Sequence, residues 1–259
     1  MITTTFSSQN NLSFPIIMAP MFLVSNEAMI QAAMRSGIMG TFPTLNYRKE
    51  NELKEVIERL HAYRKNQQNA GSFGVNLIVQ KSNPLYPKHL DICVEGKVPF
   101  YITSLGNPKE VIERAHAYGG KVYCDVTNLE HAEKCASLGA DGFIAVCQGA
   151  GGHAGPYPFS VLIPALKEKF PQIPVIAAGG IATGAGIVSA LSLGAEGVSI
   201  GTRYLASKEA GVSEAYKEAV VASGMEDIVL TERLSGTPCA VINTPYVQKI
   251  GLHQNAIEK

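Results

Sequence analysis

Short apolar runs alternate with amphipathic stretches along almost the whole chain. Apolar runs of about four to eight residues predict strands, and longer stretches with apolar positions at helical spacing predict helices. The predicted strands are Pro15–Pro20, Ile38–Phe42, Ser72–Val79, Phe100–Ser104, Lys121–Val126, Gly142–Val146, Pro174–Ala178 and Gly197–Ile200. The predicted helices are Ser25–Ser36, which Ser25 is expected to cap, Lys49–Lys65, Leu85–Glu95, Pro108–Tyr118, Leu129–Leu138, Ser160–Phe170, Gly184–Leu193 and Ala206–Ser223.

The strict alternation of strands and helices indicates an α/β fold with a parallel sheet. Such a sheet can remain open and doubly wound, or it can close into a barrel, and eight nearly equal units favour a (β/α)8 TIM barrel. The 259 residues suit one domain over residues 1–259, because barrels of about 250 residues form single domains. The segment from about Thr231, with Pro238 and Pro245, is predicted to be an irregular C-terminal tail that wraps the barrel.

The composition is that of a neutral metabolic protein with a large core. Hydrophobic residues make up 46% of the chain and charged residues 17%, with a formal net charge of zero. No basic surplus favours nucleic acid or an anionic membrane surface as a partner. The five cysteines are scattered without a Cys-x-x-Cys pair, which argues against a disulfide scaffold or a structural zinc site. No apolar run approaches the roughly 20 residues of a membrane span, so a cytoplasmic location is expected.

Two Gly-rich segments follow the seventh and eighth predicted strands. They are Ala178-Gly179-Gly180-Ile181 and Ser199-Ile200-Gly201-Thr202-Arg203. Barrels often hold a phosphate at these two strand ends, where glycines let backbone N–H groups approach the oxygens closely. Each segment alone is equally consistent with a tight turn, but the two together favour a phosphate site.

A third Gly-rich segment, Gln148–Gly155, follows the sixth predicted strand and contains His153. An imidazole ordinarily titrates near pH 6.5, so it can act as an acid or a base around neutrality. A lone histidine in a loop is usually a surface residue. The functional interpretation is favoured here because side chains at the carboxyl ends of barrel strands form the active site.

Other strand ends carry less specific signals. Pro15–Met21, read alone, is simply the end of a strand. Asn76 either caps the next helix or binds a ligand, and Asp125 is either a buried structural acceptor or a site residue. No Gly-x-Gly-x-x-Gly motif follows a strand, which argues against a Rossmann dinucleotide site.

Together these segments resemble the nitronate monooxygenase family, formerly called 2-nitropropane dioxygenases, over about Ser13 to Leu252. The resemblance rests on Pro15-Ile16-Ile17-Met18-Ala19-Pro20-Met21, Phe73-Gly74-Val75-Asn76-Leu77, Gly149-Ala150-Gly151-Gly152-His153-Ala154-Gly155, Val175-Ile176-Ala177-Ala178-Gly179-Gly180-Ile181 and Gly201-Thr202-Arg203-Tyr204-Leu205.

The resemblance implies an FMN-dependent barrel that converts nitronates or nitroalkanes, with O2, to a carbonyl compound and nitrite. His153 matches the catalytic base that removes the α-proton of a nitroalkane. The implied FMN-binding residues are Ala19, Pro20 and Met21 along the flavin ring, the polar Asn76 and Gln148, and also Gly151, Gly152, Ala178, Gly179, Gly180, Ser199, Ile200, Gly201 and Thr202.

This sequence departs from the pattern of the better-characterised members. They usually have Glu and Arg where this loop has Gly149 and Ala154. A subgroup with Gly-Ala-Gly-Gly-His-Ala-Gly is more similar to this chain. Many relatives also continue beyond the equivalent of Leu252 with a segment that covers the flavin. The resemblance therefore implies a site that is open or is completed by the second subunit of a homodimer.

Two other functions are consistent with the same sequence. The first is an NAD(P)H-dependent flavin reductase of the same superfamily, because enoyl-acyl-carrier-protein reductases carry a similar Gly-Gly-His loop and quinone reductases are related. The second is a non-catalytic barrel that binds FMN or phosphate.

Overall fold

The computed structural model describes residues 2–254 and contains a closed barrel of parallel strands. The strand order is β1-β2-β3-β4-β5-β6-β8-β9, and pairing of Ile17 with Ser199 joins the first strand to the last. The predicted (β/α)8 barrel is therefore confirmed. The strands are β1 (Ile16–Met18), β2 (Met39–Pro43), β3 (Phe73–Ile78), β4 (Phe100–Ser104), β5 (Lys121–Val126), β6 (Gly142–Val146), β8 (Val175–Ala178) and β9 (Gly197–Ile200).

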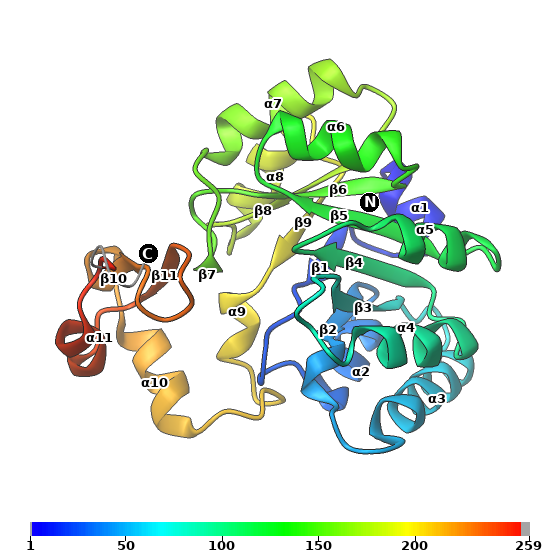
Figure 1. Cartoon of the computed structure of the whole chain (residues 1–259), viewed down its shortest axis with the longest axis horizontal. Coiled ribbons are helices and arrows are strands. Elements are labelled where there is room, and N and C mark those ends of the chain that lie inside the picture. Colours follow the sequence, from blue (N-terminus) through cyan, green and yellow to red (C-terminus); the bar gives the residue numbers. More distant parts are fainter. Residues whose placement is uncertain (1, 255–259) are drawn as a thin grey trace.

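Helices surround the barrel, as Figure 1 shows. Within residues 2–254 no helix is long and apolar enough to cross a membrane. The helices between barrel strands are α2 (Glu27–Arg35), α3 (Glu52–Asn66), α4 (Tyr86–Glu95), α5 (Lys109–His116), α6 (Leu129–Ser137), α7 (Phe159–Lys169) and α8 (Gly184–Ser192), with the 3-10 turn η1 (Thr44–Asn46) after β2.

The N-cap of the first of these helices lies one residue later than predicted. The Asn26 side chain, and not that of Ser25, accepts a hydrogen bond from the backbone N–H of Met29 at 3.0 Å. The Ser25 hydroxyl instead accepts from the backbone N–H of Met21 at 2.9 Å. Ser25 therefore stabilises the turn that follows β1 and leaves the capping role to its neighbour.

The barrel interior is filled by a cluster of apolar side chains, which includes Ile17, Ile102 and Tyr123. The short helix α1 (Thr5–Gln9), which the sequence pattern did not predict, closes the end at which the strands begin. Its Phe6 is fully buried, with ring centroids 6.1 Å from Phe100 and 5.8 Å from Tyr123.

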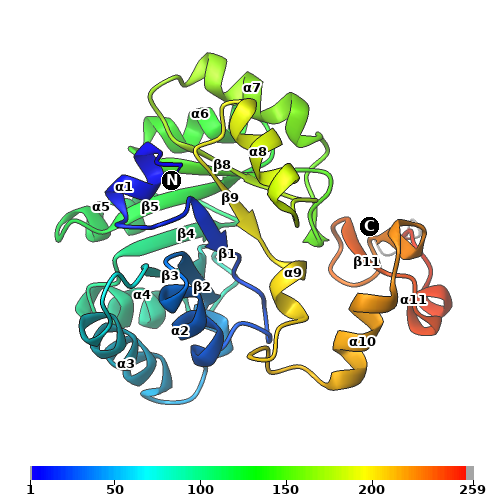
Figure 2. The same cartoon turned by 180° about the vertical axis from the view of Figure 1, so that it is seen from behind.

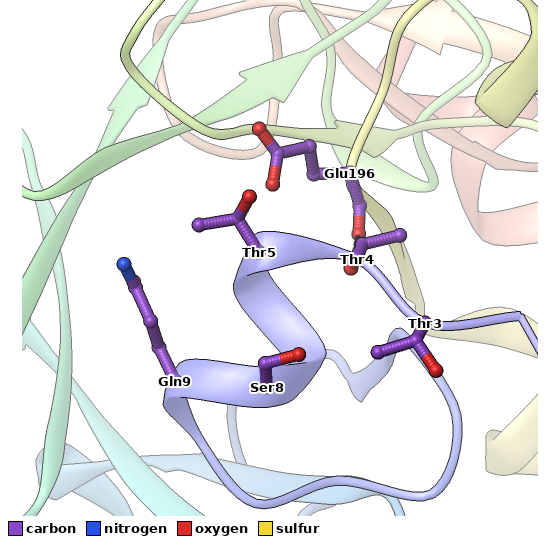
Figure 3. Close-up of a pocket in the computed structure, with 6 residues that line it drawn as sticks. All are labelled: Thr3, Thr4, Thr5, Ser8, Gln9 and Glu196. Atoms are coloured by element: carbon purple, nitrogen blue, oxygen red, sulfur yellow. Dashed lines mark hydrogen bonds between the residues drawn. The ribbon is translucent and has the colours of Figure 1, made fainter.

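A polar hollow lies beside α1 at this closed end. The Thr4 hydroxyl donates to the Glu196 carbonyl at 2.7 Å, and the Phe6 N–H donates to the Glu196 carboxylate at 3.3 Å. These contacts attach α1 to the barrel. Because Glu196 directly precedes β9, the hollow is at the end of the barrel where the strands begin, opposite the Gly-rich loops. Figure 3 shows the residues that line it: Thr3, Thr4, Thr5, Ser8, Gln9 and Glu196.

The chain after β9 forms an arm, defined here as residues 206–254. Figures 1 and 2 both show it to one side of the barrel, reached through α9 (Thr202–Leu205). The small antiparallel sheet of the arm has the order β10-β11-β7 and includes two residues of the His153 loop. The elements of this part are α10 (Glu214–Ala222), η2 (Met225–Asp227), β10 (Ile228–Thr231), β11 (Cys239–Ile242), α11 (Pro245–Ile250) and β7 (Gly152–His153).

The arm corrects two predictions. The segment from about residue 231 was expected to be irregular and to wrap the barrel, but it contains β11 and α11 and meets the barrel through β7. Pro245 begins α11 and does not interrupt a helix, since the first helical turn needs no N–H from it. The helix predicted over 206–223 begins only at Glu214, where the Ser213 side chain caps it.

Candidate active site at the mouth of the barrel

The loops after β6 and β8 pack directly against each other. The Cys147 N–H donates to the Ala178 carbonyl at 2.8 Å. A Cβ added at Gly149 would lie 3.0 Å from the Cα of Gly180, and a Cβ at Gly179 would lie 2.8 Å from the nitrogen of Ala150. Backbone therefore meets backbone here, and only glycine permits the approach.

The ends of β1 and β9 form the adjoining part of the mouth. The Ala19 N–H donates to the Ile200 carbonyl at 2.8 Å. A Cβ at Gly201 would lie 3.6 Å from the Cβ of Ala19 and 3.7 Å from the sulfur of Met21. Pro20 lies between these two contacts in the chain and is partly exposed.

The loop after β6 also reaches the end of β9. A Cβ at Gly151 would lie 2.9 Å from the Thr202 hydroxyl oxygen. Gly180 and Thr202 are exposed, while Ser199 and Ile200 are buried beneath them in β9. The structure thus brings the predicted segments of β1, β6, β8 and β9 together at one edge, with glycine backbone lining it.

His153 lies in β7, where it pairs with Cys239 of β11. Its imidazole is exposed, and Nε2 is 2.9 Å from the Ser235 hydroxyl oxygen. The Ala154 N–H also contacts the arm, donating to the Pro238 carbonyl at 3.4 Å. The arm therefore contacts both the backbone and the ring of His153. Ser235 is a candidate site residue that no local sequence pattern indicates.

The ends of the His153 loop are closed by backbone contacts. The Gln148 N–H donates to the Tyr157 carbonyl at 2.8 Å, and Gln148 is exposed. A Cβ at Gly155 would collide with the Val146 carbonyl oxygen. Gly152 has φ +75° with open space around it, so it is required for its backbone conformation and not for packing.

A hydrogen-bonded chain of three side chains joins the ends of β3, β4 and β5. The buried Asn76 donates through Nδ2 to the Ile102 carbonyl at 3.2 Å and to the Ser104 hydroxyl at 2.7 Å. The Ser104 hydroxyl donates to Asp125 Oδ2 at 2.5 Å. Asn76 therefore does not cap the following helix. Burial raises the pKa of Asp125 from 3.8 to about 6, against a smaller opposing effect of the Ser104 hydrogen bond.

Among residues 2–254 no cluster of three or more His, Cys, Asp or Glu side chains is arranged to hold a metal ion. The groups that the structure brings to the mouth include the His153 imidazole, the hydroxyl groups of Ser104 and Thr202, the amides of Asn76 and Gln148, the Asp125 carboxyl group and glycine backbone.

The chain is similar in sequence to proteins of one enzyme family. The profile described as nitronate monooxygenase matches residues 45–258. A probable nitronate monooxygenase of Staphylococcus saprophyticus is 31% identical over 217 residues, which are 79% of this chain and 61% of that protein. A (3aS,4S,5R,7aS)-5-hydroxy-7a-methyl-1-oxo-octahydro-1H-indene-4-carboxyl-CoA dehydrogenase of Rhodococcus jostii is 29% identical over 251 residues, 96% of this chain and 68% of that protein. The chain thus spans about two thirds of the length of these relatives.

Solved structures show the same fold. FabK from Thermotoga maritima has a TM-score of 0.86 and 32% identity, with 96% of this chain and 77% of that chain covered. Nitroalkane oxidase from Streptomyces ansochromogenes has a TM-score of 0.84 with 95% and 81% covered, but its 24% identity supports the fold alone.

Fold, site and similarities together define a flavin-dependent barrel oxidoreductase. The chain belongs to the nitronate monooxygenase family, because the family profile covers well over half of its length.

Proposed function

We propose that this chain is an FMN-dependent enzyme that oxidises alkyl nitronates or nitroalkanes with O2 to a carbonyl compound and nitrite. The observation that carries this proposal is the glycine-lined edge where the ends of β6, β8 and β9 meet. A phosphorylated flavin needs backbone N–H groups that its phosphate oxygens can approach closely, and the glycines let these strand ends come together at one edge.

The residues of the mouth fit the parts of FMN. Gly180, Gly201 and Thr202 offer backbone N–H groups and one hydroxyl to the phosphate. Ala19 to Met21 offer apolar surface to the ring, and Asn76 and Gln148 offer amide groups to its polar edge. When bound, the flavin supplies the electron acceptor that a nitronate needs. The remaining predicted residues, namely Gly151, Gly152, Ala178, Gly179, Ser199 and Ile200, shape the backbone between these groups.

His153 is the proposed base for neutral nitroalkanes. Proton abstraction needs a ring nitrogen with a free lone pair. When Nε2–H donates to the Ser235 hydroxyl oxygen, the lone pair is on Nδ1. In that tautomer Nδ1 can accept the α-proton, and the contact with Ser235 keeps the orientation of the imidazole.

The proposal is tested by comparing two substrates in one variant. His153→Ala should retain FMN and lose about 10² to 10⁴ of the rate with a neutral nitroalkane, as general-base removal does. A preformed nitronate has already lost the α-proton, so its oxidation should be much less affected. Steady-state nitrite formation measures both rates. Equal, negligible effects on the two substrates would remove His153 from the mechanism.

A second candidate function is an NAD(P)H-dependent flavin reductase. The 32% identity to FabK over 96% of this chain favours it, as do Gly149 and Ala154, which replace the Glu and Arg usual in better-characterised monooxygenases. Rapid anaerobic bleaching of the flavin by NADH or NADPH, with none by alkyl nitronate, would establish this function. A purified chain without flavin and without affinity for added FMN would instead indicate a non-catalytic barrel.

A further inference from the structure

Three polar side chains at the mouth face the barrel interior on neighbouring strands. Side chains two residues apart on a strand point to the same face. Ile102 and Tyr123 belong to the interior cluster, so Ser104 and Asp125 point inward above them. Pairing of Ile78 with Ser104 brings the third strand, with Asn76, alongside.

The hydrogen bonds of these side chains run in one direction. The Ile102 carbonyl can only accept, so the amide atom 3.2 Å from it is the nitrogen of Asn76. Its second N–H faces the Ser104 oxygen. An ionised Asp125 can also only accept, so the Ser104 hydroxyl hydrogen is directed to Asp125 Oδ2 and the Ser104 oxygen stays free to accept from Asn76.

This direction determines what Asn76 can offer to a ligand. Both of its N–H groups are used within the protein. Its amide oxygen, Oδ1, is therefore the atom that remains, and it is a hydrogen-bond acceptor. The ring of oxidised flavin carries a single N–H, the imide N3–H, which is the donor that such an acceptor matches.

We propose that Asp125 is a positioning residue of the flavin site, which acts through Ser104 to keep the Asn76 amide oxygen available to the flavin imide N–H. This inference rests on the proposed flavin site. A protonated Asp125 can donate to Ser104, which frees the Ser104 hydrogen to turn toward Asn76 and opposes the amide orientation. The acceptor is therefore maintained while Asp125 is ionised.

The surroundings make Asp125 sensitive to pH. Within residues 2–254 it forms no ion pair, and its burial raises its pKa to about 6. The titratable groups that feel its charge are two thiols. The pKa of Cys124, on the same strand, is raised mainly by its hydrogen bond with Cys135 and to a smaller extent by Asp125. The pKa of Cys135, on α6, is lowered by that same hydrogen bond, which the charge of Asp125 opposes. The proposed control of Asn76 should therefore weaken as the pH falls through about 6.

The test uses FMN and N3-methyl-FMN, which lacks the imide N–H. The flavin-depleted full-length chain is titrated with each flavin at pH 8, and the ratio of the two dissociation constants is compared between variants. A net neutral hydrogen bond is worth about threefold to tenfold in affinity. Asp125→Asn, Ser104→Ala and Asn76→Ala should each reduce the preference for FMN by about that factor, whereas a steric penalty from the methyl group would persist in all of them.

Asp141→Asn is the matched control, because Asp141 accepts from Val122 N–H at the opposite end of the barrel. It should keep the wild-type preference. In the wild type the preference should also fall at pH 5, while in Asp125→Asn it should not change with pH.

An unchanged preference for FMN in both Asp125→Asn and Ser104→Ala, alongside a reduced one in Asn76→Ala, overturns the positioning role of Asp125. Lack of binding of either flavin by the wild-type chain overturns the proposed flavin site itself, so the two failures are distinguishable. Circular dichroism shows that each variant is folded, and the isosteric Asp125→Asn keeps the interior volume.

Discussion

The partly buried carboxyl group of Asp125 should reduce the stability of the barrel at neutral pH. Burial raises its pKa from 3.8 to about 6, so the folded chain binds this proton more tightly than the unfolded chain does. The free energy of unfolding therefore falls as the pH rises from about 4 to about 6, because the unfolded chain releases the proton first. Asp125→Asn cannot ionise and should escape this loss.

The magnitude follows from the two pKa values. At 1.36 kcal/mol for each pH unit, the change from 3.8 to about 6 corresponds to about 3 kcal/mol at most. About 1.4 kcal/mol of this is recovered by lowering the pH from about 8 to about 5, where the folded protein is already largely protonated at this site. The stability advantage of Asp125→Asn over the wild type should therefore shrink by about 1.4 kcal/mol between these pH values.

Urea unfolding of both proteins at pH 8 and pH 5 measures this difference, because all other titrating groups are common to the two chains. Asp141→Asn provides a control of opposite sign. The pKa of Asp141 is lowered by its hydrogen bonds with Lys121, the Val122 N–H and His116 despite its burial, so its removal should cost stability above its pKa. An advantage of Asp125→Asn that is the same at both pH values would refute the argument from burial.

Three further changes test other contacts. Ser235→Ala removes the partner of His153 Nε2 and should slow nitroalkane oxidation about tenfold in kcat/KM, as loss of one orienting hydrogen bond does, with FMN affinity and nitronate oxidation retained. Gly179→Ala should strongly weaken FMN binding in a fluorescence titration, because φ is +123° and the new Cβ would lie 2.8 Å from the Ala150 nitrogen. Asn26→Ala removes the α2 cap and the hydrogen bond from Nδ2 to the Glu209 carbonyl, and should lower the free energy of unfolding by about 1 to 2 kcal/mol in urea titrations.

Much of the barrel could be predicted because its strands have a local signal. The bounds of β4, β5, β6 and β9 agree with the predicted ones to the residue, since each strand is a short apolar run between a helix and a turn. The Gly-rich ends of β8 and β9 were also placed at the mouth correctly, because barrel strands all end at the same edge.

The site could be predicted only in part. His153 and Ser235 are 82 residues apart, and their contact depends on the pairing of β7 with β11, which no local pattern encodes. Asp125 was visible as an acid in an apolar run, but its hydrogen bond to Ser104 requires the register of β4 and β5. The short apolar run of β11, Cys239–Ile242, lies between Pro238 and Pro245, which favoured irregular structure there over a strand. The roles assigned to His153 and to the FMN-binding residues, the use of NAD(P)H, a homodimer and a cytoplasmic location stay predictions.

The most direct test of the central claim is anaerobic stopped-flow spectroscopy of the FMN-loaded chain. The oxidised flavin absorbance is followed after mixing with an alkyl nitronate and, separately, with NADH or NADPH. The proposed function predicts rapid reduction by the nitronate and, when O2 is readmitted, stoichiometric nitrite. Rapid reduction by NADH or NADPH with none by the nitronate would contradict it.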